Sequence, residues 1–119
     1  MLTAKQISDY VDSHKEEAIQ FLQEIIRTPS VTGDEEAVSF TFERWMKEAG
    51  LEVQRIEAEP HRPNLYAEWF GSQKGKRFVF NGHMDVFPPD SRDPGLYGPW
   101  SGKIVDGYLY GRGACDMKG

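Results

Sequence analysis

This chain has a single cysteine, no long apolar run and no concentration of positive charge. Cys115 cannot form a disulfide within the chain, which fits a reducing compartment. No stretch approaches the roughly 18 apolar residues that a membrane span needs. The first residues, Met1 to Gln6, contain no apolar signal core. Together these absences predict a soluble, cytoplasmic protein without a membrane partner.

Negative charge is in excess. The chain contains 14 Lys and Arg against 19 Asp and Glu, which gives a formal net charge of −5. The densest basic cluster, Lys74–Arg77, is short and is typical of a solvated turn before a strand. Because a nucleic-acid surface needs a basic patch to neutralise phosphates, we expect no nucleic-acid partner.

The size and composition favour one globular unit. The 119 residues can make at most one domain. Apolar residues are 39% and charged residues 28% of the chain, a balance typical of a folded protein rather than a disordered one.

The first half of the chain is predicted to be helical. Apolar residues recur at helical spacing through Thr3–Ile26, and a capping-box pattern at Ser13–Glu16 predicts a break near Ser13. A second capping-box pattern, Thr32–Glu35, precedes the apolar face of a helix over 37–49, where Gly50 is a natural stop.

The second half carries strand and turn signals. Leu51–Val53 and Asn64–Phe70 alternate in polarity, and the short apolar run Arg77–Asn81 is typical of a central strand. A loop with four prolines is predicted over 84–102. The next segment, Ile104–Leu109, predicts a hairpin with a type I′ turn at Asp106-Gly107. This order of elements predicts an α/β fold.

The motif GHMDV, residues 82–86, places His83 and Asp85 two residues apart after the predicted central strand. Side chains at this spacing in an extended chain point to the same side. A metal-binding histidine needs its second ring N–H held, and a carboxylate commonly holds it. His83 is therefore a candidate metal ligand and Asp85 its orienting partner. A strand-end histidine beside a surface aspartate is the alternative, and the bare pattern favours that alternative.

A second motif, GRGACDMKG at residues 111–119, contributes Asp116, which follows His83 by 33 residues. Its glycines allow close backbone approach and unusual torsions. An aspartate in such a turn can offer both oxygens to two cations, although alone it would be an ordinary turn residue. The adjoining Cys115 has no histidine placed to activate it, so we expect a small buried residue there.

These motifs resemble the N-terminal part of the M20 metallopeptidase family, which includes acetylornithine deacetylase, succinyl-diaminopimelate desuccinylase, aminoacylase and carboxypeptidase-like members. The residues that carry the resemblance are GHMDVFPP, Asp106–Tyr110 and GRGACDMKG, with upstream matches at Ile26–Val31 and Arg62–Leu65. One local departure is Pro99-Trp100, where members often have Pro-Phe.

The resemblance implies a role for each of His83, Asp85 and Asp116. His83 would bind one of two divalent metal ions, typically zinc, with cobalt or manganese as substitutes. Asp116 would bridge the two ions, and Asp85, the position usually considered catalytic, would orient His83. A water between the metals would attack an amide carbonyl. The peptide bond after the bridging aspartate is often cis in this family, which makes Asp116–Met117 a candidate.

The resemblance also implies that residues 1–119 are the N-terminal segment of a mixed-sheet zinc-hydrolase catalytic domain with two layers of helices. The general base, the remaining metal ligands and the lid domain that often mediates homodimerisation would lie outside this chain. The substrate would be a small N-acyl amino acid or peptide. The chain alone should be inactive, because a catalytic zinc needs about three protein ligands.

Two other interpretations stay open. The chain could be a non-catalytic product of a truncated or degenerate gene, or a small binding module that keeps the scaffold. Alternatively it could be a cation-binding regulatory domain that uses only His83, Asp85 and Asp116.

Overall fold

The computed structural model describes residues 2–72, 74–92 and 95–119. Met1 at the N-terminus and Pro94 of the predicted loop lie outside the described residues. In the described part of the chain, three helices come first and two antiparallel hairpins follow, which confirms the α/β class. None of the helices in the described part of the chain is long and apolar enough to cross a lipid bilayer.

Two helices, α1 (Ala4–Ser13) and α2 (Lys15–Arg27), meet at His14 and confirm the predicted break. The predicted cap at Ser13 is wrong. Its hydroxyl donates to the carbonyl of Tyr10 at 2.7 Å, and no side chain caps the start of α2. The capping box of the region lies at the start of α1 instead, between Thr3 and Gln6.

Helix α3 (Glu36–Glu48) confirms the predicted third helix, and Gly50 follows it in a left-handed conformation, with φ of 84°. The predicted cap at Thr32 is wrong as well. Glu35 occupies the N-cap position and makes no side-chain bond to the first turn. The Thr32 hydroxyl donates instead to the carboxylate of Asp85. A residue type that favours helix starts is thus used for a contact between distant segments.

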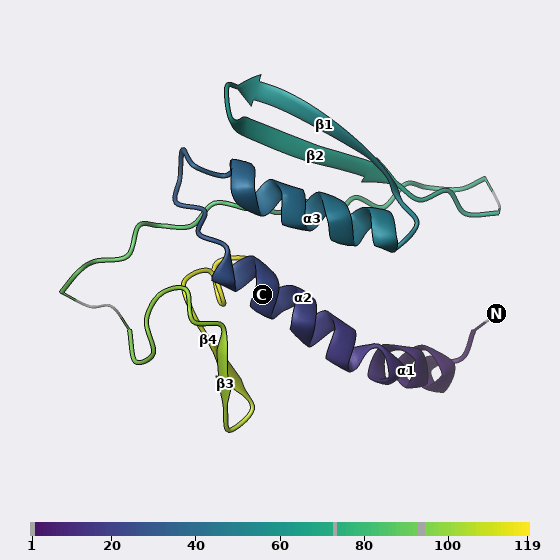
Figure 1. Ribbon diagram of the computed structural model, residues 1–119. Helices are drawn as coiled ribbons and strands as arrows, with labels where there is room; N and C mark the ends of the chain where they lie inside the picture. Colours follow the sequence, from purple (N-terminus) through teal and green to yellow (C-terminus); the bar gives the residue numbers. More distant parts are fainter. Residues whose placement is uncertain (1, 73, 93–94) are drawn as a thin grey trace.

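Strands β1 (Glu52–Glu59) and β2 (Arg62–Glu68) form an antiparallel hairpin. Strand β1 is longer than the predicted segment Leu51–Val53, and β2 begins two residues before the predicted Asn64–Phe70. Helix α3 lies between this hairpin and α2, so the three make successive layers (Figure 1). The guanidinium of Arg55 in β1 donates to the hydroxyl of Ser39 in α3 at 2.8 and 2.9 Å, which ties the sheet to the helix.

The second hairpin, β3 (Lys103–Val105) and β4 (Tyr108–Tyr110), confirms the prediction at residue level. Asp106 and Gly107 connect its strands with φ of 50° and 81°. Positive φ at both central residues is the signature of the predicted type I′ turn.

The prediction of a central strand over Arg77–Asn81 is wrong, because this segment is not a strand in the structure. Phe78, Val79 and Phe80 are 81, 77 and 91% exposed. Among the described residues, β1 and β2 pair only with each other and β3 only with β4. A segment without a neighbouring strand has no ladder to join, so its backbone groups stay with water.

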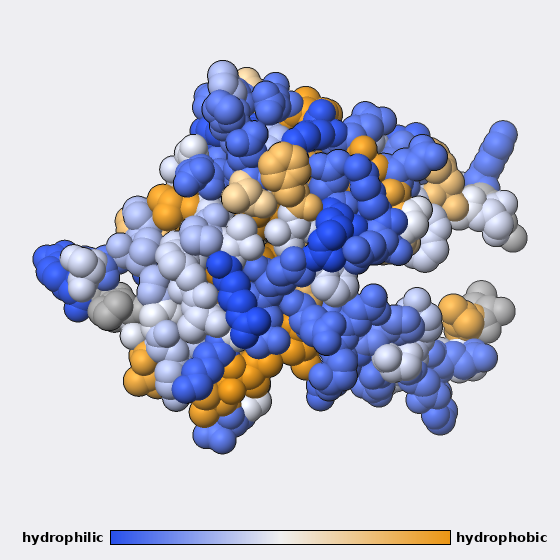
Figure 2. Space-filling model, in the orientation of Figure 1, coloured by the Kyte–Doolittle hydropathy of each residue, from blue (hydrophilic) through white to orange (hydrophobic). Residues whose placement is uncertain are grey.

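The apolar core is small and lies where α2, α3 and the segment after His83 meet. Ile25, Ile26, Val38 and Val86 are the buried hydrophobic residues of the described chain. The radius of gyration is 16.3 Å, against roughly 13.5 Å for a compact domain of this length. The face in Figure 2 is largely hydrophilic, with hydrophobic residues gathered over the β3–β4 hairpin, where Ile104 is 42% exposed.

Candidate metal and catalytic site

The two motifs meet at one end of α2. The segment after Gly82 runs beside the segment that follows α2, joined by a parallel bridge between Val31 and Val86. Val86 N–H donates to the carbonyl of Ser30 at 2.9 Å, and Thr32 N–H donates to the carbonyl of Val86 at 3.2 Å. This bridge fixes the backbone that carries His83 and Asp85.

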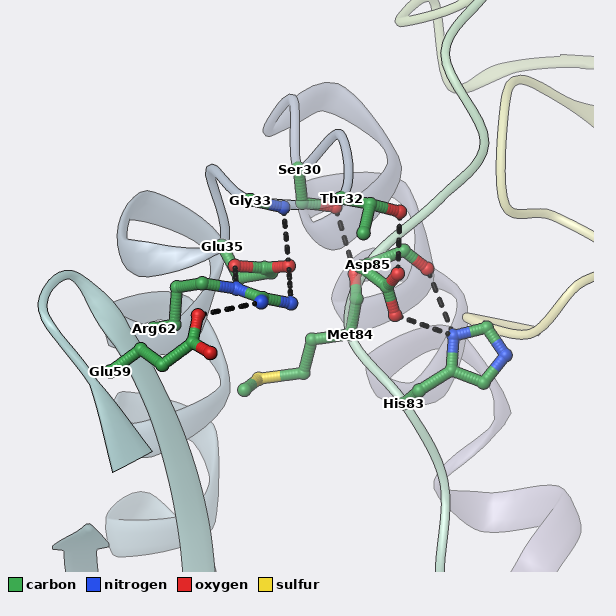
Figure 3. A network of polar contacts seen from close by, with 9 residues as sticks. All are labelled: Ser30, Thr32, Gly33, Glu35, Glu59, Arg62, His83, Met84 and Asp85. Carbon is green, nitrogen blue, oxygen red and sulfur yellow. Dashed lines mark hydrogen bonds and ion pairs between the residues drawn. The ribbon is translucent and has the colours of Figure 1, made fainter. Parts of the chain in front are cut away.

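His83 lies between two carboxylates, each facing a different ring nitrogen. Nδ1 is 3.0 Å from Oδ1 of Asp85 and 3.0 Å from the backbone carbonyl of the same residue (Figure 3). Nε2 is 3.2 Å from Oδ1 of Asp116. The structure therefore brings together all three residues that the sequence indicated, with Asp85 behind the imidazole and Asp116 in front of it.

The surroundings favour the charged forms of both His83 and Asp85. The backbone carbonyl of Asp85, followed by the carboxylate of Asp116, raises the pKa of His83. The hydroxyl of Thr32 lowers the pKa of Asp85, and the imidazole charge of His83 adds to this effect. Without a metal ion, a protonated imidazole can donate to the two carboxylates at once.

The turn that carries Asp116 packs directly on the segment that carries His83. A Cβ on Gly113, which has φ of 88°, would come within 2.7 Å of Cγ1 of Val86. A Cβ on Gly82 would meet the side chain of Met117 at 3.1 Å. The Asp116–Met117 peptide bond is cis, as predicted. Glycines in both motifs therefore permit the approach that puts Asp116 near His83.

Lys118 anchors the turn that carries Asp116, a role that its position in the sequence did not predict. Its ammonium donates to the carbonyl of Ile25 at 2.6 Å and to that of Thr28 at 3.0 Å. These carbonyls lie at the end of α2, where cations are favoured. Burial lowers the pKa of Lys118 to about 8. A long side chain thus reaches from the Asp116 turn to the helix end.

The prediction that Cys115 is buried is wrong, because its thiol is exposed. The core at this turn is filled by Lys118 and the backbone of Gly113, which are buried. The cysteine beside Asp116 consequently points away from the packed interior.

The donor geometry of His83 and Asp116 fits part of a metal site. Two donors sharing a tetrahedral zinc ion at about 2.0–2.2 Å lie about 3.4 Å apart, close to the 3.2 Å between Nε2 and Oδ1. Nitrogen and carboxylate oxygen suit zinc. Across the described ranges, no group of three or more His, Cys, Asp or Glu side chains could hold a metal ion. The chain thus offers two donors and an orienting carboxylate.

An open cleft of about 940 Å³ lies beside the site. Its walls come from α3, the β1–β2 hairpin, the segment Phe80–Asp85 and the Met117-Lys118 pair. His83 and Asp85 are therefore accessible from a space large enough for a small molecule.

A second polar cluster braces the turn before α3 (Figure 3). The guanidinium of Arg62 donates to both carboxylate oxygens of Glu35 at 2.9 Å, and Gly33 N–H donates to the same carboxylate at 2.7 Å. Glu59 accepts from Arg62 at 3.0 Å on the outer side. The turn between Thr32 and α3 is held by this cluster on the side away from His83.

Comparison with known proteins gives one family and a consistent set of relatives. Residues 79–119, which contain both motifs, match Peptidase family M20/M25/M40. The chain is 48% identical over 102 residues to succinyl-diaminopimelate desuccinylase of Methylorubrum extorquens, covering 82% of this chain and 26% of the relative.

Two further relatives carry the same name. The protein of Methylorubrum populi is 50% identical over 100 residues, which cover 80% of this chain and 25% of the relative. That of Cereibacter sphaeroides is 40% identical over 95 residues, with the same two coverages. The chain thus spans about a quarter of the length of the curated relatives it matches.

Proposed function

We propose that His83, Asp85 and Asp116 are this chain's contribution to the dinuclear metal site of an amide hydrolase, since residues 79–119, which contain all three, match Peptidase family M20/M25/M40. The observation that carries the proposal is the arrangement around one imidazole. Asp85 occupies Nδ1 at 3.0 Å, which leaves Nε2 facing the carboxylate of Asp116 at 3.2 Å. A nitrogen and a carboxylate oxygen at this separation can both be ligands of one cation.

Each residue has a separate task in this proposal. Asp85 accepts the Nδ1 proton and so keeps the electron pair of His83 on Nε2. His83 and Asp116 are metal ligands, and the second carboxylate oxygen of Asp116 is available for a second ion. Divalent ions, when bound, would supply the Lewis acidity that activates water and polarises an amide carbonyl. Zinc is the proposed metal, with cobalt or manganese as substitutes.

The proposed substrate is a small N-acylated amino acid. The support is that the relatives are named succinyl-diaminopimelate desuccinylases, which favours desuccinylation over the deacetylation that the wider family includes. The cleft beside His83 has room for such a molecule. Residues 1–119 are proposed as the N-terminal segment of the catalytic domain, with the lid and further ligands on other parts of the polypeptide. Homodimerisation of that polypeptide and its cytoplasmic location stay predictions.

Zinc titration calorimetry tests the metal site. The chain should bind zinc weakly, since it offers two ligands, and His83→Ala or Asp116→Asn should abolish the signal. His14→Ala is the matched control, because this exposed histidine lies at the α1–α2 junction. Titrations that are identical for the chain and His83→Ala would eliminate the proposed site.

Hydrolysis assays test the division of labour. The purified 119-residue chain with zinc should release no succinate from N-succinyl amino acids, because the base and the remaining ligands are absent. Turnover by the chain that is lost in Asp85→Ala would contradict the proposed segment role.

The DNA that follows the Gly119 codon separates the enzyme from its alternative. A continuing reading frame that encodes a Glu-Glu pair and a later histidine is expected for the hydrolase. A stop codon would instead support a truncated, non-catalytic product or a small binding module, which the similarity to the desuccinylases does not favour.

A further inference from the structure

The backbone of Thr32 is fixed beside Asp85 from two directions. Its N–H donates to the carbonyl of Val86, and the hydroxyl of Ser30 donates to the carbonyl of Met84 at 2.8 Å. Ser30 is fully buried, so this pairing is shielded from water. On the other side, the next residue, Gly33, donates to the carboxylate of Glu35. These hydrogen bonds therefore fix the backbone of Thr32 between two segments that are distant in sequence.

The hydroxyl of Thr32 donates a hydrogen bond to the carboxylate oxygen of Asp85 that does not face His83. It donates to Oδ2 at 2.6 Å, while Oδ1 faces Nδ1 of His83 at 3.0 Å (Figure 3). Each oxygen thus has a side-chain partner from a different residue. The terminal torsion of an aspartate is otherwise broad, so a single contact with His83 would leave the carboxylate free to rotate.

A short bond from a hydroxyl to a carboxylate is among the stronger hydrogen bonds in proteins. Asp85 is 30% exposed at its side chain, so water would compete for Oδ2 if the hydroxyl were absent. Water imposes no fixed orientation on the carboxylate. The Thr32 hydroxyl therefore adds orientation to Asp85 that solvent cannot supply.

We propose that Thr32 is a positioning residue: its hydroxyl orients the Asp85 carboxylate, which in turn holds the Nδ1–H tautomer of His83 and leaves Nε2 available for a metal ion. This inference rests on the proposed function of His83 and Asp85. It adds to that site a hydroxyl that contacts Asp85, on a segment more than 50 positions earlier in the chain.

Two substitutions test the hydroxyl. Thr32→Val keeps the branched shape and loses the donor, whereas Thr32→Ser keeps the donor. Zinc affinity should fall about tenfold in Thr32→Val, the lower end of what loss of an outer-shell partner costs, and stay within about twofold in Thr32→Ser. Equal losses in the two variants would overturn the proposal. Asp34→Ala, which alters an exposed residue two positions after Thr32, is the control.

A second readout needs no metal. Imidazole ¹⁵N shifts of His83, recorded at alkaline pH where the ring is neutral, report which nitrogen carries the proton. The Nδ1–H tautomer should dominate in the chain and in Thr32→Ser, and it should lose population in Thr32→Val. Unchanged tautomer populations in Thr32→Val would contradict the positioning role.

A double-mutant cycle separates positioning from folding. With Asp85→Ala as background, the added Thr32→Val change should have no further effect on zinc affinity, because the carboxylate it orients is gone. A further tenfold loss in that background would show a merely structural role and overturn the proposal. If the chain and His83→Ala bind zinc alike, the proposed function fails, whereas zinc binding through His83 that is insensitive to Thr32→Val refutes only the positioning role.

Discussion

Glu35 places a negative charge in a nearly closed environment at the turn before α3. Its side chain is only 7% exposed, and Arg62 supplies both donors of a bidentate pair. These hydrogen bonds lower the pKa of Glu35 below its usual 4.5. Because the charged form is the one that the fold stabilises, the contribution is complete above about pH 4.5 and is lost as the pH falls through the lowered value.

The first prediction concerns this pair. Glu35→Gln should lower the urea midpoint at pH 7, and the difference from the unaltered chain should shrink as the pH is lowered from about 4.5, because the native Glu35 then becomes neutral as well. Far-UV circular dichroism from pH 7 to 3 measures both midpoints. Glu57→Gln, at an exposed position of β1, is the control and should stay parallel to the unaltered chain. A constant difference down to pH 3 would contradict the assignment.

At the residue scale, the sequence predicted that His83, Asp85 and Asp116 act together, and they lie together in the structure, but it did not predict all their partners. His83, Asp85 and Asp116 were predictable because motif spacing and residue chemistry both mark them. Thr32 was interpreted as a helix cap, which is the common use of threonine before an acidic turn. Its actual partner is 53 positions away, and no local pattern encodes such a contact.

At the element scale, the turn after β4 depends on a glycine in contact with α2. A Cβ on Gly111 would come within 2.2 Å of Cγ2 of Ile26, which is fully buried. We expect Gly111→Ala to destabilise the chain by about 1–3 kcal/mol through overpacking. Urea unfolding measures the loss, with Gly71→Ala as control because its Cβ would meet nothing within 4 Å. Equal midpoints for the two variants would show that this contact is not formed.

The end of α2 depends on a side chain that is remote in sequence. Lys118→Met should leave the carbonyls of Ile25 and Thr28 without their donor, at a cost of about 1–3 kcal/mol for buried unsatisfied groups. The Thr28 amide, which donates to the carbonyl of Glu24, should exchange faster with deuterium. Lys15→Met, at the exposed start of the same helix, should leave that exchange rate unchanged. Unaltered exchange in Lys118→Met would count against the anchor.

The elements that were predicted correctly are those whose structure is set by residues close together in the sequence. The three helices and the β3–β4 hairpin were predictable because periodicity and turn residues act within a few positions. Arg77–Asn81 failed because a central strand is defined by its neighbours, and its sequence describes only its own preference for burial. The parallel contact of Val31 with Val86 had no sequence signal of this kind.

At the scale of the whole molecule, apolar surface exceeds what the small core can cover. Trp69, Phe70, Phe78 and Phe80 are 90, 73, 81 and 91% exposed. We expect the isolated chain to bind ANS and to associate with rising concentration, as exposed strand-like apolar segments do. Phe80→Ser should reduce ANS fluorescence because it removes a largely exposed aromatic ring. Helical circular dichroism should stay unchanged, since the ring that Phe80 packs against is that of Phe78, outside the helices. A sharp cooperative melt without ANS binding would contradict this prediction.

The parallel bridge beside Asp85 also sets the order in which the molecule can assemble. It joins Val31 to Val86 across 55 positions, and closing a loop of that length costs about 3.6 kcal/mol in chain entropy beyond a constant. The two hairpins and the helices close far shorter loops and form on the microsecond scale. We therefore expect His83, Asp85 and Asp116 to come together after those elements have formed, so that the proposed metal site is completed late in folding.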